Sequence, residues 1–216
     1  MEKKDFFIFD LDGTLFDSRR DITDSIFFAL IKNGIKRYPW DQIYLMLKMG
    51  SLNLMEAIAY AESPKLLPKI IKIFRDFYSH HLFDHSSLYP GVKQFLESSK
   101  NIKKVIWTIK DKEMAIKILK KYNINDYIDE VVGGDAINIK RKPDPSYINL
   151  IMEGLGIAKE KAIMIGDTLL DIKAAKNLGV KICCVSYGFT PKNELIEAGA
   201  DYIIDEIGEL VNFLNK

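Results

Sequence analysis

The pattern of hydrophobic and polar positions divides the chain into two kinds of segment. From about residue 100 onward, short apolar runs alternate with amphipathic stretches, and one further apolar run stands near the start, at residues 6–9. This alternation predicts a parallel sheet that helices cover on both faces. The predicted later strands span 103–108, 127–132, 162–165, 180–185 and 201–204, and the predicted helices span 112–122, 145–155, 169–178, 191–198 and a last segment from 206.

Residues 17–85 follow a different pattern. Amphipathic stretches at 21–33, 41–48, 54–61 and 66–82 predict helices, with breaks at Gly34, Gly50 and Ser63-Pro64, and we predict no strand there. The segment 83–91, with Tyr89-Pro90-Gly91, is the expected return to the sheet. We therefore predict an α/β fold whose core comprises residues 1–16 and 86–216, with an all-helical domain inserted at 17–85.

Composition excludes some partners. Among 216 residues, 31 basic and 30 acidic side chains leave a formal net charge of +1, which gives no reason to expect nucleic acid or an anionic membrane as a partner. No apolar run reaches the roughly 18 residues of a membrane span, and the first residues lack a signal-peptide pattern. We expect a cytoplasmic protein in which Cys183 and Cys184 are reduced packing residues.

The first candidate for chemistry is the run Asp10-Leu-Asp12-Gly13-Thr14, directly after the first strand. A chain that turns here can place both carboxylates and several backbone N–H groups around one small site. An aspartate nucleophile beside an acid–base carboxylate needs that arrangement. The alternative is a strand that ends in a polar Asp-Gly turn.

Two further candidates are single residues beside predicted strands or helices. Thr108 ends the predicted strand 103–108, where its hydroxyl and the next N–H could bind a phosphoryl oxygen, although threonine is ordinary there. Lys142 precedes a helix begun by prolines and could neutralise a carboxylate or a phosphoryl group; a solvated basic loop is the alternative.

A pair of acidic residues follows the strand at 162–165. Asp167 lies just past its end and Asp171 four residues later, which keeps both on one side of a first helical turn. Two carboxylates in this position suit a hard cation such as Mg²⁺. Helix capping is the alternative.

Taken together, these four pieces resemble the haloacid dehalogenase superfamily, specifically its phosphoglycolate phosphatase-like branch, over essentially the whole chain. Asp10-Leu-Asp12-Gly-Thr-Leu-Phe-Asp17-Ser18 and Gly166-Asp167-Thr-Leu-Leu-Asp171 are the specific matches. The resemblance implies a Rossmann-like core with a helical cap between the first and second motifs. It also implies phosphatase activity through an aspartyl-phosphate.

The resemblance further implies a role for each motif residue. Asp10 is the expected nucleophile and Asp12 the expected general acid and base, with Mg²⁺ held by Asp10, the backbone carbonyl of Asp12, Asp167 and, directly or indirectly, Asp171. Thr108 is expected to hold the phosphoryl oxygens and Lys142 to orient Asp10. The other expected substrate contacts come from Gly13, Thr14 and Ile109 and, in the cap, from Lys48. The alternative for Lys48 is a solvated lysine at the end of a helix.

The substrate itself is left open. The superfamily's dehalogenases lack a carboxylate at the position of Asp12, so a phosphorylated metabolite is favoured over a halide. The branch usually has Asn where this chain has Ile109, which weakens the case for phosphoglycolate. A phosphosugar mutase resembling β-phosphoglucomutase, a pyrophosphatase or nucleotidase, and a non-catalytic regulatory protein are the alternatives, and relatives suggest a monomer or homodimer.

Overall fold

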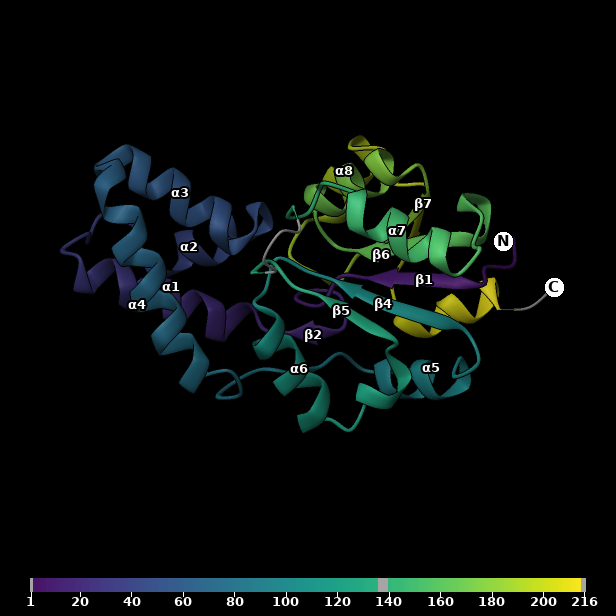
Figure 1. Cartoon of the computed structure of the whole chain (residues 1–216). Helices are drawn as coiled ribbons and strands as arrows, with labels where there is room; N and C mark the ends of the chain where they lie inside the picture. Colours follow the sequence, from purple (N-terminus) through teal and green to yellow (C-terminus); the bar gives the residue numbers. More distant parts are fainter. Residues whose placement is uncertain (1, 136–139, 215–216) are drawn as a thin grey trace. The chain divides into compact units, whose positions relative to one another are not determined.

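The computed structural model, which describes residues 2–135 and 140–214, divides the chain into two units (Figure 1). The core domain consists of Met1–Phe16 and Leu88–Lys216, and the cap domain consists of Asp17–Ser87. The chain thus re-enters the core two residues after the position expected from the sequence. Each domain is described by itself below.

A six-stranded sheet of order β5-β4-β1-β6-β7-β8 forms the centre of the core domain. All neighbouring strands are parallel, as the alternating pattern predicts. The strands are β1 (Phe6–Phe9), β4 (Lys103–Trp107), β5 (Glu130–Val132), β6 (Ala162–Gly166), β7 (Lys181–Val185) and β8 (Tyr202–Ile204). Because β1 pairs with both β4 and β6, the carboxyl ends of these three strands meet at one edge of the sheet, where open α/β sheets place their sites.

The fully buried strand β1 shows how the sheet is covered. Successive side chains of a strand point to opposite faces. Phe6 and Ile8 accordingly join the cluster that contains residues of α7 (Ser146–Gly154) and α8 (Leu169–Leu178). Phe7 and Phe9 instead meet the ring of Phe95, in α5 (Val92–Ser98), at centroid distances of 5.7 and 6.2 Å. Helices α7 and α5 lie on opposite sides of the sheet in Figure 1.

The helices of the core differ from the sequence expectations at two places. Besides α5, α7 and α8, the helical segments of the core are α6 (Lys112–Lys121), α9 (Lys192–Glu197) and the 3₁₀ segments η3 (Asn125–Tyr127), η4 (Lys159–Lys161) and η5 (Ile207–Phe213). Helix α5 was not predicted, since seven residues are too few for a clear amphipathic period. The last segment is 3₁₀ rather than α-helical: Ile207, Leu210 and Phe213 are all buried, and their spacing of three matches a 3₁₀ turn.

The cap domain is helical, and short strands lie where the chain passes between the domains. Its helical segments are α1 (Arg19–Lys32), α2 (Trp40–Met46), η1 (Leu47–Met49), α3 (Ser51–Glu62), η2 (Pro64–Leu66) and α4 (Leu67–His80). Strands β2 (Phe16–Asp17) and β3 (Ser87–Leu88) pair with each other. The prediction of no strand from residue 17 to 85 is therefore wrong at Asp17, because two-residue strands carry no readable alternation.

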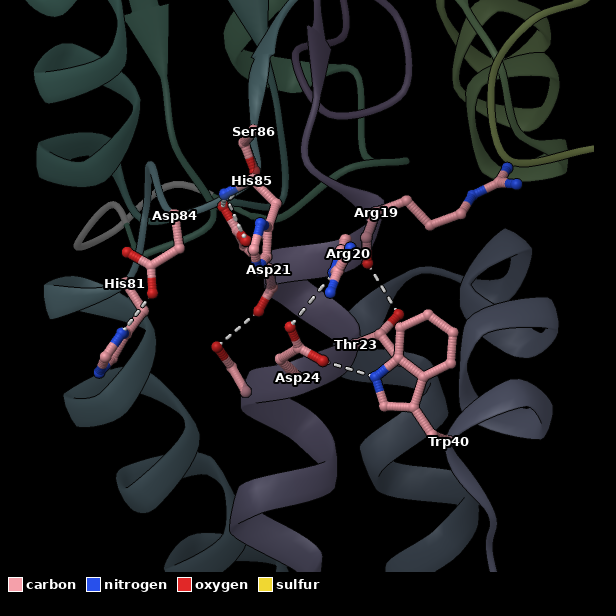
Figure 2. Close-up of polar contacts among 11 residues, drawn as sticks. Arg19, Arg20, Asp21, Thr23, Asp24, Trp40, His81, Asp84, His85 and Ser86 are labelled. Carbon is pink, nitrogen blue, oxygen red and sulfur yellow. Dashed lines mark hydrogen bonds and ion pairs between the residues drawn. The ribbon is translucent and has the colours of Figure 1, made fainter.

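Stacked aromatic rings and a polar network hold the cap together. Phe28 of α1 stacks on Phe77 of α4 with centroids 4.1 Å apart. Asp21, buried in the first turn of α1, accepts hydrogen bonds from the backbone N–H of His85 (3.0 and 3.1 Å) and from Ser86 Oγ (2.5 Å), as Figure 2 shows. One carboxylate thereby joins the segment that enters the cap to the segment that leaves it.

A second carboxylate in the cap joins α1 to α2. Asp24 accepts a hydrogen bond from Trp40 Nε1 (2.5 Å) and lies 4.0 Å from the Arg20 guanidinium (Figure 2). Asp24 and Asp21, together with His85, have potential ligand atoms within 4.8 Å of one another. Both carboxylates already serve these structural contacts, so we assign no metal to this group.

Two expectations about composition can be compared with the structure. Over the described part of the chain, the helices fall short of the length and apolarity that crossing a membrane requires. Cys183 and Cys184 are buried as free thiols in β7. Burial raises the pKa of the Cys183 thiol to about 12, so it stays protonated and inert.

Candidate active site

The loop after β1 carries Asp10 and Asp12. The strand ends at Phe9, and the N–H groups of Thr14, Leu15 and Phe16 all point to the carbonyl oxygen of Leu11 at 3.3, 2.9 and 3.0 Å. Asp10 is buried and its own N–H donates to the Ile165 carbonyl of β6 (2.8 Å). The polar turn considered in the sequence analysis therefore exists, and it coils the chain tightly beside the strand ends.

Gly13 makes this coil possible. Its φ of +83° lies in the left-handed region, which disfavours other residues. A Cβ at Gly13 would stand 2.2 Å from Asp167 Oδ2, so the backbone and the carboxylate could not approach as they do. Thr14 reinforces the same contact: its hydroxyl donates to Asp167 Oδ1 at 2.9 Å. In the structure, Gly13 and Thr14 thus support Asp167, which the sequence analysis did not expect of them.

Lys142 is the cation at the centre of the site. Its side chain is 1% exposed, and its ammonium group lies 3.2 Å from Asp10 Oδ1 and pairs with Asp171 Oδ1. It also donates to the Trp107 carbonyl at the end of β4 (3.1 Å). The alternative of a solvated basic loop is therefore wrong for Lys142, whereas Lys140 and Arg141 are exposed.

Asp167 and Asp171 are both completely buried. Asp171 Oδ2 accepts hydrogen bonds from the N–H of Asp167 (3.1 Å) and of Thr168 (2.8 Å) and from Thr168 Oγ1 (2.6 Å), which caps the start of α8. Capping and a place in the acidic cluster are therefore combined in one side chain. The sequence analysis treated them as alternatives.

Three carboxylates meet at this point and could hold a metal ion. Single oxygen atoms of Asp10, Asp167 and Asp171 lie within 4.8 Å of one another. A donor set made only of carboxylates fits a hard divalent cation. The cluster brings three carboxyl groups together beside one lysine, which favours an additional cation.

The electrostatics of the cluster follow from its burial. Burial, partly offset by Lys142 and increased by Asp171 and Asp12, raises the pKa of Asp10 from 3.8 to about 7. Burial and the neighbouring Asp171 and Asp10 raise the pKa of Asp167 well above its usual range. Burial alone would lower the pKa of Lys142, but the carboxylates of Asp10 and Asp171 outweigh it and the pKa ends above its usual value.

The segment after β7 supplies partners that the sequence analysis missed. The N–H of Phe189 donates to Asp167 Oδ2 (2.7 Å), and the Tyr187 hydroxyl donates to the Thr14 carbonyl (2.9 Å). A Cβ at Gly188 would lie 2.2 Å from Asp167 Cβ, so only glycine fits there. The contact of this segment with Asp167 has no signal in local sequence.

The segment after β4 brings Thr108 and a second lysine to the site. Thr108 is buried, and its Oγ1 accepts a hydrogen bond from the N–H of Lys110 (3.2 Å). Ile109 is half-buried, and its apolar side chain offers no hydrogen bond to a substrate. Lys110 received no role from the sequence, yet its ammonium group lies 3.2 Å from Asp12 Oδ1 and its side chain is 3% exposed.

Burial and charge act in opposite directions on Lys110. Burial lowers its pKa, and the carboxylates of Asp12, Asp111 and Asp10 offset part of this. The signal available in sequence was a lysine two residues past a strand end that already carried a candidate threonine. Lys48, the remaining candidate, lies in η1 of the cap domain, is half-buried, and stays a prediction.

Comparisons with known proteins place the chain in one family. The family model described as haloacid dehalogenase-like hydrolase matches residues 7–185. The phosphoglycolate phosphatase of Aquifex aeolicus (strain VF5) is 31% identical over 211 residues, which cover 97% of this chain and 96% of the relative. The phosphoglycolate phosphatase of Nitrosococcus oceani is 29% identical over 226 residues, with 100% and 99% covered.

Solved structures share the fold of the chain. The crystal structure of a predicted phosphatase from Clostridium acetobutylicum superposes with a TM-score of 0.84 at 29% identity, and 98% of each chain is covered. A haloacid dehalogenase-like hydrolase from Bacteroides fragilis superposes with a TM-score of 0.85 at 22% identity, over 96% of this chain and all of the other. The second likeness concerns the fold alone.

Proposed function

The chain belongs to the haloacid dehalogenase-like hydrolase family and is a phosphatase, and we propose that it hydrolyses a small phosphomonoester through an aspartyl-phosphate on Asp10 with Mg²⁺ as cofactor. The observation that carries the proposal is the setting of Asp10. Its carboxylate is buried at the end of the central strand, touches Lys142, and belongs to a three-carboxylate cluster.

The first half of the reaction forms the covalent intermediate. A carboxylate oxygen of Asp10 attacks phosphorus while the bond from phosphorus to the ester oxygen breaks. Asp12 gives its carboxyl proton to that ester oxygen, so a neutral alcohol leaves. Lys142 keeps Asp10 in place and offsets part of the negative charge.

The second half releases phosphate. Asp12, now a carboxylate, takes a proton from water as the water oxygen attacks the phosphorus of the aspartyl-phosphate. The bond between phosphorus and the Asp10 oxygen breaks, and inorganic phosphate and the Asp10 carboxylate result. Thr108 and the N–H of Ile109 are the groups we assign to the phosphoryl oxygens.

Mg²⁺ is the cation we propose for the acidic cluster. Asp10, Asp167, Asp171 and the backbone carbonyl of Asp12 are the groups we assign to it, with Asp171 acting mainly through Lys142 and the helix cap. When bound, the ion supplies positive charge that lets a phosphate dianion approach several carboxylates. Hard oxygen donors are the chemistry that supports this choice.

The substrate is proposed as a small phosphorylated metabolite, and phosphoglycolate is the first candidate because relatives of that name match nearly the whole chain. The side chain of Ile109 has no amide group to offer a substrate, so other small phosphomonoesters belong in the same test. In the cap, we propose Lys48 for an anionic part of the leaving group. A Lys48→Met variant should then raise KM for an anionic substrate and leave KM for an uncharged one unchanged.

The test is phosphate release from phosphoglycolate, sugar phosphates, nucleotides and pyrophosphate, with Mg²⁺ or with EDTA. We expect turnover that EDTA abolishes and Mg²⁺ restores, and that Asp10→Asn lacks. Accumulation of a sugar bisphosphate would instead identify a mutase. Turnover that survives Asp10→Asn would refute the assignment of the nucleophile.

A further inference from the structure

Lys110 is a second buried cation of the active site. Its backbone is held on both sides: its N–H donates to Thr108 Oγ1 (3.2 Å), and its carbonyl accepts from the N–H of Gly134 (2.9 Å). The ammonium group lies 3.2 Å from Asp12 Oδ1. All four residues belong to the core domain, so this geometry is internal to one unit.

The two lysines of the site serve different carboxylates. Lys142 lies against Asp10 and Asp171, whereas the ion pair of Lys110 is with Asp12. Moving an ammonium group out of water is unfavourable unless a well-placed partner offsets the lost hydration. A lysine whose side chain is 3% exposed therefore implies a function for its contact with Asp12.

Asp12 is the residue whose orientation needs such support. It follows the end of β1 in the coiled loop, directly before Gly13, rather than within a strand. Its side chain is 13% exposed and so is not confined by packing alone, unlike that of Asp167. An ammonium group 3.2 Å from Oδ1 restricts the rotation of the carboxyl group.

We propose that Lys110 is a positioning residue for Asp12, which holds the acid–base carboxyl group in line with the ester oxygen of the substrate. The assignment rests on the proposed function. The proton moves from Asp12 to the ester oxygen as the phosphorus–oxygen bond breaks, and Lys110 itself gives up no proton. Its effect should therefore depend on how much the leaving group needs that proton.

The competing role is direct binding of the phosphoryl group by Lys110. The two roles differ in their dependence on the leaving group. An alkoxide leaves poorly unless it is protonated, whereas p-nitrophenolate leaves readily as an anion. A positioning role affects alkyl esters alone, while phosphoryl binding affects both esters.

The experiment compares kcat/KM for the best alkyl phosphomonoester and for p-nitrophenyl phosphate in wild type and Lys110→Met. General acid catalysis contributes about 10²–10⁴-fold, so we expect a loss of about 10²-fold or more with the alkyl ester and less than about 3-fold with the nitrophenyl ester. Equal losses on both substrates, or no loss on either, would overturn the assignment.

Two additional variants separate positioning from damage to the fold. Lys104→Met is the matched control, since Lys104 is also buried, in the strand β4 that precedes the Lys110 segment, but donates to the carbonyls of Ser99 and Ile102. We expect it to lose stability without discriminating between the two esters. Discrimination by the control equal to that of Lys110→Met would overturn the proposal.

The double variant Asp12→Asn/Lys110→Met removes both charges of the pair, so no buried charge is left without its partner. If Lys110 acts through Asp12, the second substitution should add less than about 3-fold to the loss caused by Asp12→Asn alone. An additional tenfold loss would overturn the assignment while leaving the phosphatase proposal intact. Absence of turnover by wild type on both esters would overturn the proposed function and this assignment with it.

Discussion

Replacing Asp10, the nucleophile in our proposal, by Asn should make the metal-free protein more stable. Burial raises the pKa of Asp10 from 3.8 to about 7, even with the opposing effect of Lys142 included. Asn keeps the shape of the side chain and a carbonyl oxygen that Lys142 can hydrogen-bond, but it removes the charge. The buried negative charge is therefore the quantity that the substitution changes.

The sign and size follow from linkage. Because the folded state binds the Asp10 proton more tightly than the unfolded state, stability falls as pH rises from about 4 to about 7 and then stays low. A shift of about three pKa units corresponds to about 4 kcal/mol at pH 8. At pH 5 the gain in stability from Asp10→Asn should be less than half as large, because folded wild type is then protonated at Asp10.

The assay is thermal unfolding of wild type and Asp10→Asn in EDTA at pH 5 and pH 8. For a chain of this size, 4 kcal/mol corresponds to a rise in Tm of about 8–16 °C. Adding Mg²⁺ at pH 8 should raise the Tm of wild type more than that of the variant, since the ion offsets the same charge. The exposed Asp41 of α2 provides the control, and Asp41→Asn should change stability by less than about 0.5 kcal/mol.

Two results would refute this reasoning. One is an Asp10→Asn variant that is no more stable than wild type in EDTA at pH 8. The other is a gain of equal size at both pH values, which would mean that the stabilisation does not come from the charge of Asp10.

Three further predictions concern other parts of the molecule. Lys142→Met leaves the two carboxylates that it bridges without their cation and should cost about 3–5 kcal/mol in urea unfolding at pH 8; a loss below 1 kcal/mol would contradict the bridging role. Gly188→Ala forces a methyl group against Asp167 and should lower the free energy of unfolding by about 1–3 kcal/mol. It should also raise the Mg²⁺ concentration needed for half-maximal turnover. An unchanged Mg²⁺ dependence would show that the loop after β7 does not hold Asp167 in place for the ion. Asp21→Asn places a side-chain NH₂ group against one of the two donors, the His85 N–H or the Ser86 hydroxyl, and should destabilise the cap by about 1–3 kcal/mol, more than Asp24→Asn does. Hydrogen exchange in α1 measures both variants. Equal effects would argue against a stabilising contact between Asp21 and the His85–Ser86 segment.

Much of the core could be read from the chain. The parallel sheet was predictable because short apolar runs separated by amphipathic stretches have few other ways to bury their surface. The sheet in turn placed Asp10, Thr108 and Asp167 at one edge, since each follows a strand and parallel strands end on the same side. Chain order alone thus brought together three residues that are up to 157 positions apart.

What each side chain touches was decided only by the tertiary structure. Lys110 reads as one more polar residue after a strand, and only the fold directs its ammonium group to Asp12. The supports of Asp167 come from the loops after β1 and β7, which lie far apart in sequence, and Gly188 is needed because a carboxylate packs against it. Apolar periodicity reports which face of an element is buried, and it carries no information about which distant polar group lies opposite. The raised pKa of Asp10 depends on the removal of water by those same distant neighbours, so it exists only in the folded chain.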